Sequence, residues 1–216
     1  MFSIIIPLYN KASYIEKCLL SIACQTYRDF EVIVVNDGST DESLEKVLHF
    51  RNTKFQVLQV INQPNQGVSI ARNLGVEYSK SELIAFLDAD DWWEPTFLEH
   101  MKELILAFPE AGVYGSGYYS VKNTRKKIEP IAVDSSFTQG IINYCHVYAK
   151  NLCMPLWTGA TVIRKSVFEE ENGFNPVLKL GEDFDLWIRV ALRYPVVFLN
   201  MPLANYNQDV ELSGRA

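Results

Sequence analysis

The sequence predicts an α/β fold with three layers, α/β/α, in which helices cover both faces of a mostly parallel central sheet. Through about the first 110 of the 216 residues, short β-rich runs alternate with helical patterns, as in consecutive βαβ units. Hydrophobic residues make up 48% of the chain and aromatic residues 12%, enough for a sizeable core. We therefore expect a single domain over 1–216, whose halves are about 1–110 and about 111–216.

In the first half, four apolar runs are expected to form strands, and each is followed by a helical pattern. Ser13 and Ser39 each precede a glutamate by three residues, which is the spacing of a helix capping box. Pro95 suits the first turn of the last of these helices. The expected strands are 3–7, 30–36, 55–61 and 83–87, and the helices begin near residues 14, 40, 66 and 95.

The second half is less regular. A polar, basic stretch at Asn123–Lys127 is expected to be a hairpin tip or a loop. Gly181 precedes a strongly amphipathic helix. The other elements expected are strands at 112–121, 158–164 and 196–199, and a helix at about 139–150.

The charge balance excludes nucleic acid as an expected partner. The chain has 20 basic and 26 acidic residues, a formal net charge of −6, and no basic cluster longer than Arg125–Lys127. Neither a signal peptide nor an apolar run of about 20 residues is found. The four cysteines have no CxxC spacing and are interpreted as reduced thiols. We expect a cytoplasmic protein that is soluble or at most peripheral to a membrane.

The fourth expected strand ends in a run of carboxylates, Asp88-Ala89-Asp90-Asp91. Because strand side chains alternate, Asp88 and Asp90 should project to one side and repel each other. Mg²⁺ or Mn²⁺ shared with a diphosphate would relieve that repulsion, and ligands bind at the carboxyl ends of such strands. The alternative is a solvated acidic turn that caps the next helix. Trp92 and Trp93 could line a cleft or belong to the core.

Two other strand ends should lie along the same edge. Tyr9 could flank a base, Lys11 could face a phosphate, and Asp37 could accept a hydrogen bond from a base N–H. Taken alone, the sequence Asn36-Asp37-Gly38-Ser39 is more often an ordinary turn.

Two helix starts add further candidates. Gly67 and Arg72 belong to a helix whose N-terminus could favour an anion, although Arg72 alone would more often be an ion-pair residue. Glu182 and Asp183 begin another helix, where carboxylates are favoured without any function. Either one could instead act as a general base in a partly apolar cleft.

Together these motifs resemble those of family-2 glycosyltransferases with the Rossmann-like GT-A fold. The match extends over most of the chain, and five motifs in the right order are far more specific than each is alone. They are Ser3–Asn10, Asn36–Asp41, Asn65–Asn73, Asp88–Asp91 and Gly181–Trp187.

The resemblance implies a role for each matching residue. In the donor, a nucleotide-diphosphate sugar, the nucleoside would be held by Pro7, Tyr9 and Asp37, and the nucleotide by Arg72 and Asp88. Further candidates for donor binding, from their places in the motifs, are Asn10, Lys11 and Gly67. Asp90 would bind Mn²⁺ or Mg²⁺, and Asp183 would be the catalytic base that activates a hydroxyl acceptor, a glycan or a lipid-linked glycan. The implied reaction is a single displacement that inverts the anomeric centre, in cell-surface polysaccharide or glycoconjugate synthesis.

The chain also departs from the family pattern. It lacks the Gln-x-x-Arg-Trp motif of processive members, which favours the addition of single sugars. No basic or histidine residue occurs in Tyr206–Asp209, where many members carry one. Relatives usually continue past the position of Ala216, so we expect a C-terminal truncation.

Three other functions fit less well. A nucleotidyltransferase should carry a Gly-rich, basic loop where this chain has Tyr9-Asn10-Lys11, and an oxidoreductase needs Gly-x-Gly-x-x-Gly early in the chain. A non-catalytic module that binds a nucleotide sugar is favoured by the missing C-terminal basic residue. The presence of Asp90 and Asp183 argues against that module.

Overall fold

The computed structural model describes residues 1–53 and 58–209. The first part of the strand expected at 55–61 lies outside these residues. The strands are β1 (Phe2–Leu8), β2 (Phe30–Asp37), β3 (Leu58–Gln63), β4 (Leu83–Phe86), β5 (Trp92–Trp93), β6 (Val113–Lys122), β7 (Arg125–Ile128), β8 (Gln139–Ile142), β9 (Thr161–Arg164) and β10 (Val196–Asn207). The helices are α1 (Ile15–Ala23), α2 (Ser43–Thr53), α3 (Val68–Glu77), α4 (Phe97–Ala107), α5 (Tyr144–Asn151), α6 (Lys165–Glu170) and α7 (Glu182–Arg193), with a 3₁₀ turn at Thr158–Ala160.

One sheet passes through both halves of the chain. Its strand order is β3-β2-β1-β4-β9-β6-β10-β5, with β7 beside β6 and β8 beside β10. β1 is parallel to β2 and β4, β2 to β3, and β6 to β10, whereas β9 is antiparallel to both neighbours. From β3 to β10, β9 is therefore the one reversed strand among the described residues. The prediction of an α/β fold with a mostly parallel central sheet is confirmed.

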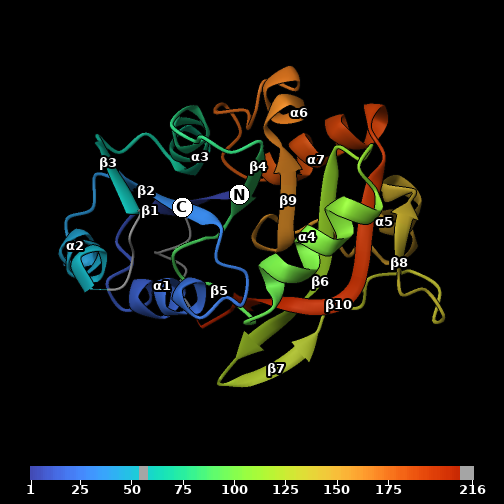
Figure 1. Cartoon of the computed structure of the whole chain (residues 1–216), viewed down its shortest axis with the longest axis horizontal. Helices are drawn as coiled ribbons and strands as arrows, with labels where there is room; N and C mark the ends of the chain where they lie inside the picture. The colour runs from blue at the N-terminus through green and yellow to red at the C-terminus, as the bar shows by residue number, and fades with distance from the viewer. Residues whose placement is uncertain (54–57, 210–216) are drawn as a thin grey trace.

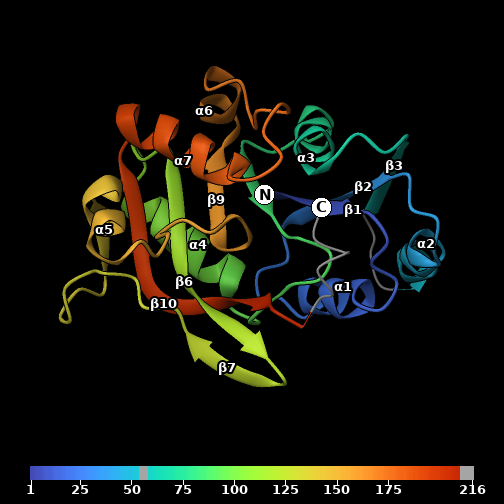
Figure 2. The ribbon, with the colours of Figure 1, turned by 180° about the vertical axis from the view of Figure 1, so that it is seen from behind.

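The sheet separates two apolar clusters. In β1, Ile4 and Ile6 pack with residues of α1 and α4, while Ile5 packs with residues of α3 and α7. Figures 1 and 2 show α3, α6 and α7 on one side of the sheet and α1 on the other. Because both faces are covered, β1 is apolar at consecutive positions rather than at alternate ones.

Neither predicted capping box forms. α1 begins after Tyr14, which makes no capping hydrogen bond with its side chain. At the start of α2 the Ser43 N–H donates to Asp41 (3.0 Å), while the Ser39 hydroxyl accepts from the Asn10 N–H (3.2 Å). Ser39 thus joins two loops at the carboxyl ends of β1 and β2 instead of capping a helix.

The helix expected at about 139–150 is only partly correct. Residues 139–142 form β8, which pairs with β10, and α5 begins after Asn143, whose side chain accepts from the His146 N–H (2.9 Å). A long-range strand pairing therefore overrides the local helical pattern. The first part of the strand expected at 158–164 is a 3₁₀ turn, and the last strand extends from 196 to 207 instead of ending at 199.

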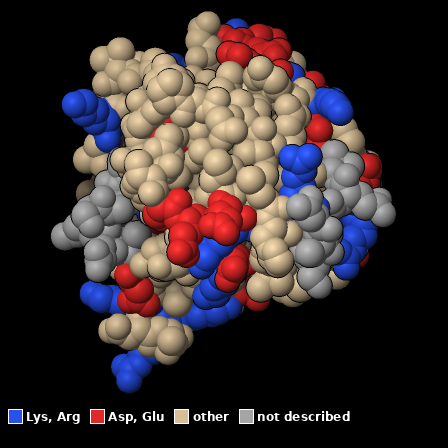
Figure 3. Space-filling view, turned by 90° about the vertical axis from the view of Figure 1, so that its left-hand side faces the viewer, with Lys and Arg blue, Asp and Glu red and all other residues tan. Residues whose placement is uncertain are grey.

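The face shown in Figure 3 carries basic and acidic side chains side by side rather than one broad basic area. No helix within residues 1–53 and 58–209 is both long and apolar enough to cross a bilayer.

Candidate active site

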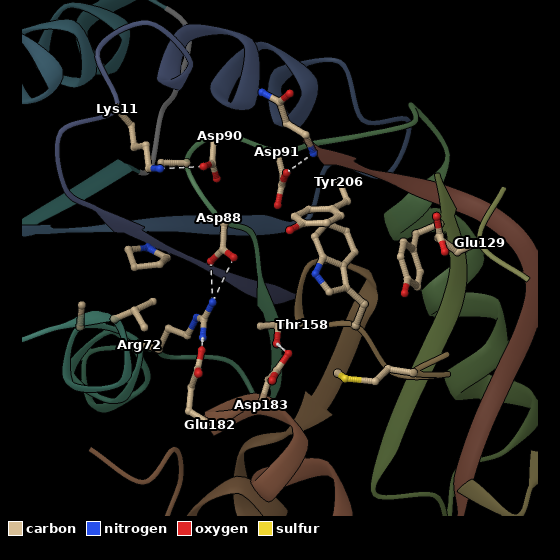
Figure 4. Close-up of a pocket in the computed structure, with 18 of the residues that line it drawn as sticks. Lys11, Arg72, Asp88, Asp90, Asp91, Glu129, Thr158, Glu182, Asp183 and Tyr206 are labelled. Atoms are coloured by element: carbon tan, nitrogen blue, oxygen red, sulfur yellow. Dashed lines mark hydrogen bonds and ion pairs between the residues drawn. The ribbon is translucent and has the colours of Figure 1, made fainter. Parts of the chain in front are cut away.

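A cavity of about 710 Å³ lies where the carboxyl ends of β1, β2 and β4 face the N-terminal end of α7. Figure 4 shows side chains from both halves of the chain pointing into it. Eight of the predicted site residues line this cavity: Pro7, Tyr9, Lys11, Asp37, Arg72, Asp88, Asp90 and Asp183. The fold thus gathers residues that are as many as 176 positions apart (183 − 7) in the sequence.

Asn10 and Gly67 do not line the cavity, but each forms a hydrogen bond with the end of β2 or with the loop that follows it. The side-chain oxygen of Asn10 accepts from the Thr40 N–H (2.8 Å). The Gly67 N–H donates to Asp37 (2.9 Å), and Gly67 has a φ of 94°, in the region that glycine adopts without strain.

Asp37 is buried and fixes the start of α3 against β2. Its carboxylate accepts from the Gln63 side chain (2.7 Å) and from the backbone N–H groups of Gln66 (2.8 Å) and Gly67 (2.9 Å). An ionised carboxylate offers about four acceptor positions. One position thus remains for a ligand donor.

The acidic run is a turn rather than an extension of the strand. β4 ends at Phe86, and the Asp91 N–H donates to the Asp88 carbonyl oxygen (3.0 Å). We expected Asp88 and Asp90 to project to one side because side chains alternate along a strand. That argument does not apply to a turn. The Asp90 carboxylate forms an ion pair with Lys11 Nζ (2.7 Å).

Negative charge is concentrated in this turn. Burial, followed by the charge of Asp88, raises the pKa of Asp90. Burial, followed by the charge of Asp90, raises the pKa of Asp91 well above the ordinary range. Asp91 also accepts from the Asn207 N–H (2.7 Å) and so ties the end of β10 to the turn.

Arg72 connects the acidic turn to α7. Its guanidinium donates to both carboxylate oxygens of Asp88 (2.8 and 3.0 Å) and to Glu182 (3.0 Å), and the side chain is only 4% exposed. Figure 4 shows Arg72 between these two carboxylates. Arg72 was expected either to favour an anion or to form an ion pair. The structure contains the ion pair, and it lies in the wall of the cavity.

This ion pair distinguishes the two acids at the start of α7. Glu182 is engaged by Arg72, whereas Asp183 accepts from its neighbour's backbone, the Phe184 N–H (2.7 Å), and lies 3.5 Å from the Thr158 hydroxyl. Burial, followed by the charge of Glu182, raises the pKa of Asp183. Of the two acids, Asp183 is therefore the one that lacks the ion pair with Arg72 and has a raised pKa.

The residues on the far side of the cavity were not predicted from the sequence. An aromatic group consisting of Tyr118, Trp157 and Tyr206 lies there, with ring centroids 5.0 Å apart for Tyr118 and Trp157 and 5.2 Å apart for Trp157 and Tyr206. These rings come from three separate segments, so no local pattern marks them. Lys127, Glu129 and Cys153 line the same side.

The tryptophan pair next to the acidic turn does not line the cavity. Trp93 is buried, stacks on Phe97 (4.3 Å between centroids) and donates its indole N–H to the Gly159 carbonyl oxygen (2.6 Å). Lys17 Nζ lies 2.9 Å from the centre of the Trp92 ring. The core alternative is correct for Trp93.

The chain has relatives among glycosyltransferases. The chain is 32% identical to glycosyltransferase GlyA of Streptococcus pneumoniae over 212 residues, which cover 94% of this chain and 30% of that protein. It is 30% identical to the uncharacterized glycosyltransferase YibD of Escherichia coli over 173 residues, which cover 79% of this chain and 50% of YibD. The chain thus spans half or less of the length of these relatives.

Solved structures show the same fold. The S. aureus TarS fragment 1–349 in complex with UDP superposes with a TM-score of 0.81 and 25% identity, over 95% of this chain and 60% of that one. The complex of TarS with UDP-GlcNAc gives a TM-score of 0.83 at 24% identity. The family model for glycosyl transferase family 2 matches residues 3–171, so the chain belongs to this family and has the GT-A fold.

Proposed function

We propose that this chain transfers a single sugar from a nucleotide-diphosphate sugar, with a UDP-sugar as the favoured donor, to a hydroxyl acceptor with inversion of the anomeric centre. Its relatives are glycosyltransferases, and its structural neighbour TarS has been solved with UDP and UDP-GlcNAc. The observation that carries the proposal is the cavity itself. It holds a carboxylate of raised pKa, Asp183, opposite an acidic turn that is partly neutralised by Lys11 and Arg72.

The nucleoside would bind at the ends of β1 and β2. Tyr9 and Pro7 offer apolar surface to a base, and the remaining acceptor position of Asp37 suits a base N–H. Lys11 lies between this end and the acidic turn, where it would face the diphosphate. Arg72 would hold Asp88 in place instead of binding the donor directly, because its guanidinium already bridges two carboxylates.

The acceptor would be activated by Asp183. Its carboxylate takes the proton of the acceptor hydroxyl while the oxygen forms a bond to the anomeric carbon. The bond from that carbon to the diphosphate breaks, and the diphosphate leaves with the electron pair. Attack opposite to the leaving group inverts the configuration in one step. A base with a raised pKa is well matched to this proton transfer at neutral pH.

Mn²⁺ or Mg²⁺ would be held by Asp90, with Asp88 beside it. Within the described residues no group of three or more His, Cys, Asp or Glu side chains could hold a metal ion. These ions commonly bind through one or two carboxylates plus substrate phosphates, and the mutual repulsion of Asp88 and Asp90 leaves negative charge to be neutralised. When bound, the ion would stabilise charge on the leaving diphosphate.

We also propose that single sugars are added, that the reaction is cytoplasmic, and that it serves polysaccharide or glycoconjugate assembly. Addition of single sugars rests on the absence of the Gln-x-x-Arg-Trp motif from this sequence. A cytoplasmic reaction agrees with four cysteines that form no disulfide. Polysaccharide or glycoconjugate assembly, with peripheral contact to a membrane, is implied by the family alone.

A thermal-shift panel of UDP-, GDP- and dTDP-sugars, with and without Mn²⁺, tests donor binding, because a ligand of the native state raises apparent stability. We expect a Mn²⁺-dependent shift with UDP-sugars that is lost in Asp90→Ala. Release of UDP in the presence of Mn²⁺ then separates an enzyme from a binding module. Binding without any release would favour the module, and the absence of both would contradict the proposal.

A further inference from the structure

The basic run of the sequence lies on a hairpin that projects from the body of the molecule. β6 and β7 pair antiparallel around a turn at Asn123–Thr124, and the hairpin extends away from the rest of the sheet in Figures 1 and 2. Residues 122–128 are all exposed. Because strand side chains alternate, the run divides between the two faces of the hairpin.

One face turns toward the body. Lys126 forms an ion pair with Glu94 and lies over the Tyr119 ring, 4.9 Å from its centre. The pKa of Lys17, on α1, is lowered by burial and then by the charge of Lys126. The charge of Lys126 is therefore already paired with that of Glu94.

The other face turns toward the cavity. Lys127 is paired with Ser120 across the hairpin, and Arg125 is paired with Lys122, so these side chains share one face, together with Tyr118. Both Tyr118 and Lys127 line the cavity. Cys153 lines the cavity as well; burial raises the pKa of its thiol, while Lys127 acts to lower it.

The three cations of this face are Lys122, Arg125 and Lys127. None of them forms an ion pair within residues 1–53 and 58–209. Three such charges on one face stand out in a chain whose formal net charge is −6. A concentrated positive surface of this kind attracts anionic ligands.

This face continues into the aromatic side of the cavity. Tyr118 packs against Trp157, and Trp157 precedes Thr158, whose hydroxyl lies 3.5 Å from Asp183. Glu129 follows on the same side, 4.0 Å from the Cys153 sulfur. Its negative charge would keep an anionic group away from the aromatic rings and leave that space to a neutral ring.

We propose that Lys122, Arg125 and Lys127 bind phosphate or carboxylate groups of an acidic glycan acceptor, whose terminal neutral sugar reaches Asp183 past Tyr118 and Trp157. The inference rests on the proposed transferase function and names its acceptor class. All three cations are exposed, which suits a chain with repeated charges better than a single small anion.

The test compares two adjacent lysines that carry the same charge on opposite faces. Lys127→Gln and Lys126→Gln are measured for binding of a fluorescent decagalacturonate, of inorganic polyphosphate and of neutral maltodecaose. We expect Lys127→Gln to weaken binding of an anionic chain about two- to fivefold, as for one exposed charge pair, and Lys126→Gln to change it less. Substituting all three cavity-side cations should abolish the preference over maltodecaose.

Equal effects of the two variants, or equal binding of maltodecaose, would overturn the inference. Binding to vesicles that contain phosphatidylglycerol, without binding to either anionic chain, would overturn it in favour of a membrane surface. UDP-sugar binding is measured in the same variants. If the donor binds but no anionic chain does, the acceptor inference alone fails; if the donor does not bind the wild-type chain, the proposed function fails first.

Discussion

Asp183 is the residue on which the proposed chemistry depends, and the charge of its neighbour Glu182 affects its pKa. Glu182 contributes to the raised pKa of Asp183, so Glu182→Gln should lower that pKa. Because a general base must be deprotonated, the rate falls as the pH drops through this pKa. We therefore expect the acidic limb of the profile of kcat/KM against pH to move to lower pH in Glu182→Gln.

The matched control is Asp185→Asn, on the same helix. Asp185 forms an ion pair with Arg189 (2.7 Å) and is not among the largest causes of the raised pKa of Asp183. Its substitution should leave the limb in place. An acidic limb that moves equally in both variants, or in neither, would contradict the role of Asp183.

Arg72 is a buried cation held by two carboxylates. Removing one partner from a buried ion pair leaves uncompensated charge, so Arg72→Gln should lower the free energy of unfolding by about 3–5 kcal/mol. Urea denaturation measures this change. The exposed Arg51→Gln should stay within about 0.5 kcal/mol of the wild type, and a similar effect of both variants would show that Arg72 is not the link between the two halves.

Helix α3 packs directly on β1 through Gly75. A Cβ at this position would lie 2.3 Å from the Cγ2 of Ile5, inside the core. Overpacking of this kind costs about 1–3 kcal/mol, so Gly75→Ala should lower the free energy of unfolding despite the better helix propensity of alanine. Glu77→Ala, at an exposed position of the same helix, is the control in the same urea titration, and an equal or stabilising effect of Gly75→Ala would contradict this packing.

Elements could be predicted from the sequence where local pattern and tertiary packing agree. β1, β2, α3 and α7 have long, regular patterns and were located to within a few residues. β8 and the second part of β10 could not be located in this way, because β8 forms by pairing with Val196–Leu199 and the second part of β10 forms by pairing with β6. The start of α2 was predicted too early, because the Ser39 hydroxyl accepts a hydrogen bond from Asn10 in the loop after β1 instead of capping the helix.

Across the whole molecule, the site is assembled by one sheet that joins both halves of the sequence. The motif residues could be predicted because they follow strands or begin helices that converge on one edge. The aromatic group of Tyr118, Trp157 and Tyr206 could not, because its members meet only through the sheet order. Strand order is a long-range property with no local signal.

The contact between Asp91 and Asn207 offers a test of this assembly. The Asn207 N–H donates to Asp91, and both residues line the cavity. A donor bound in the cavity should suppress local opening there. We expect UDP with Mn²⁺ to slow hydrogen exchange at the Asn207 amide much more than in α2, and unchanged exchange at Asn207 would place the donor elsewhere.

The most direct test of the central claim is release of UDP from a UDP-sugar, with Mn²⁺ and an acceptor, by the wild-type chain and by Asp183→Asn. Loss of a general base typically costs about 10²–10⁴-fold in rate. The account predicts a loss of this size in Asp183→Asn while the thermal shift with UDP and Mn²⁺ is unchanged. Turnover by Asp183→Asn at the wild-type rate would contradict it.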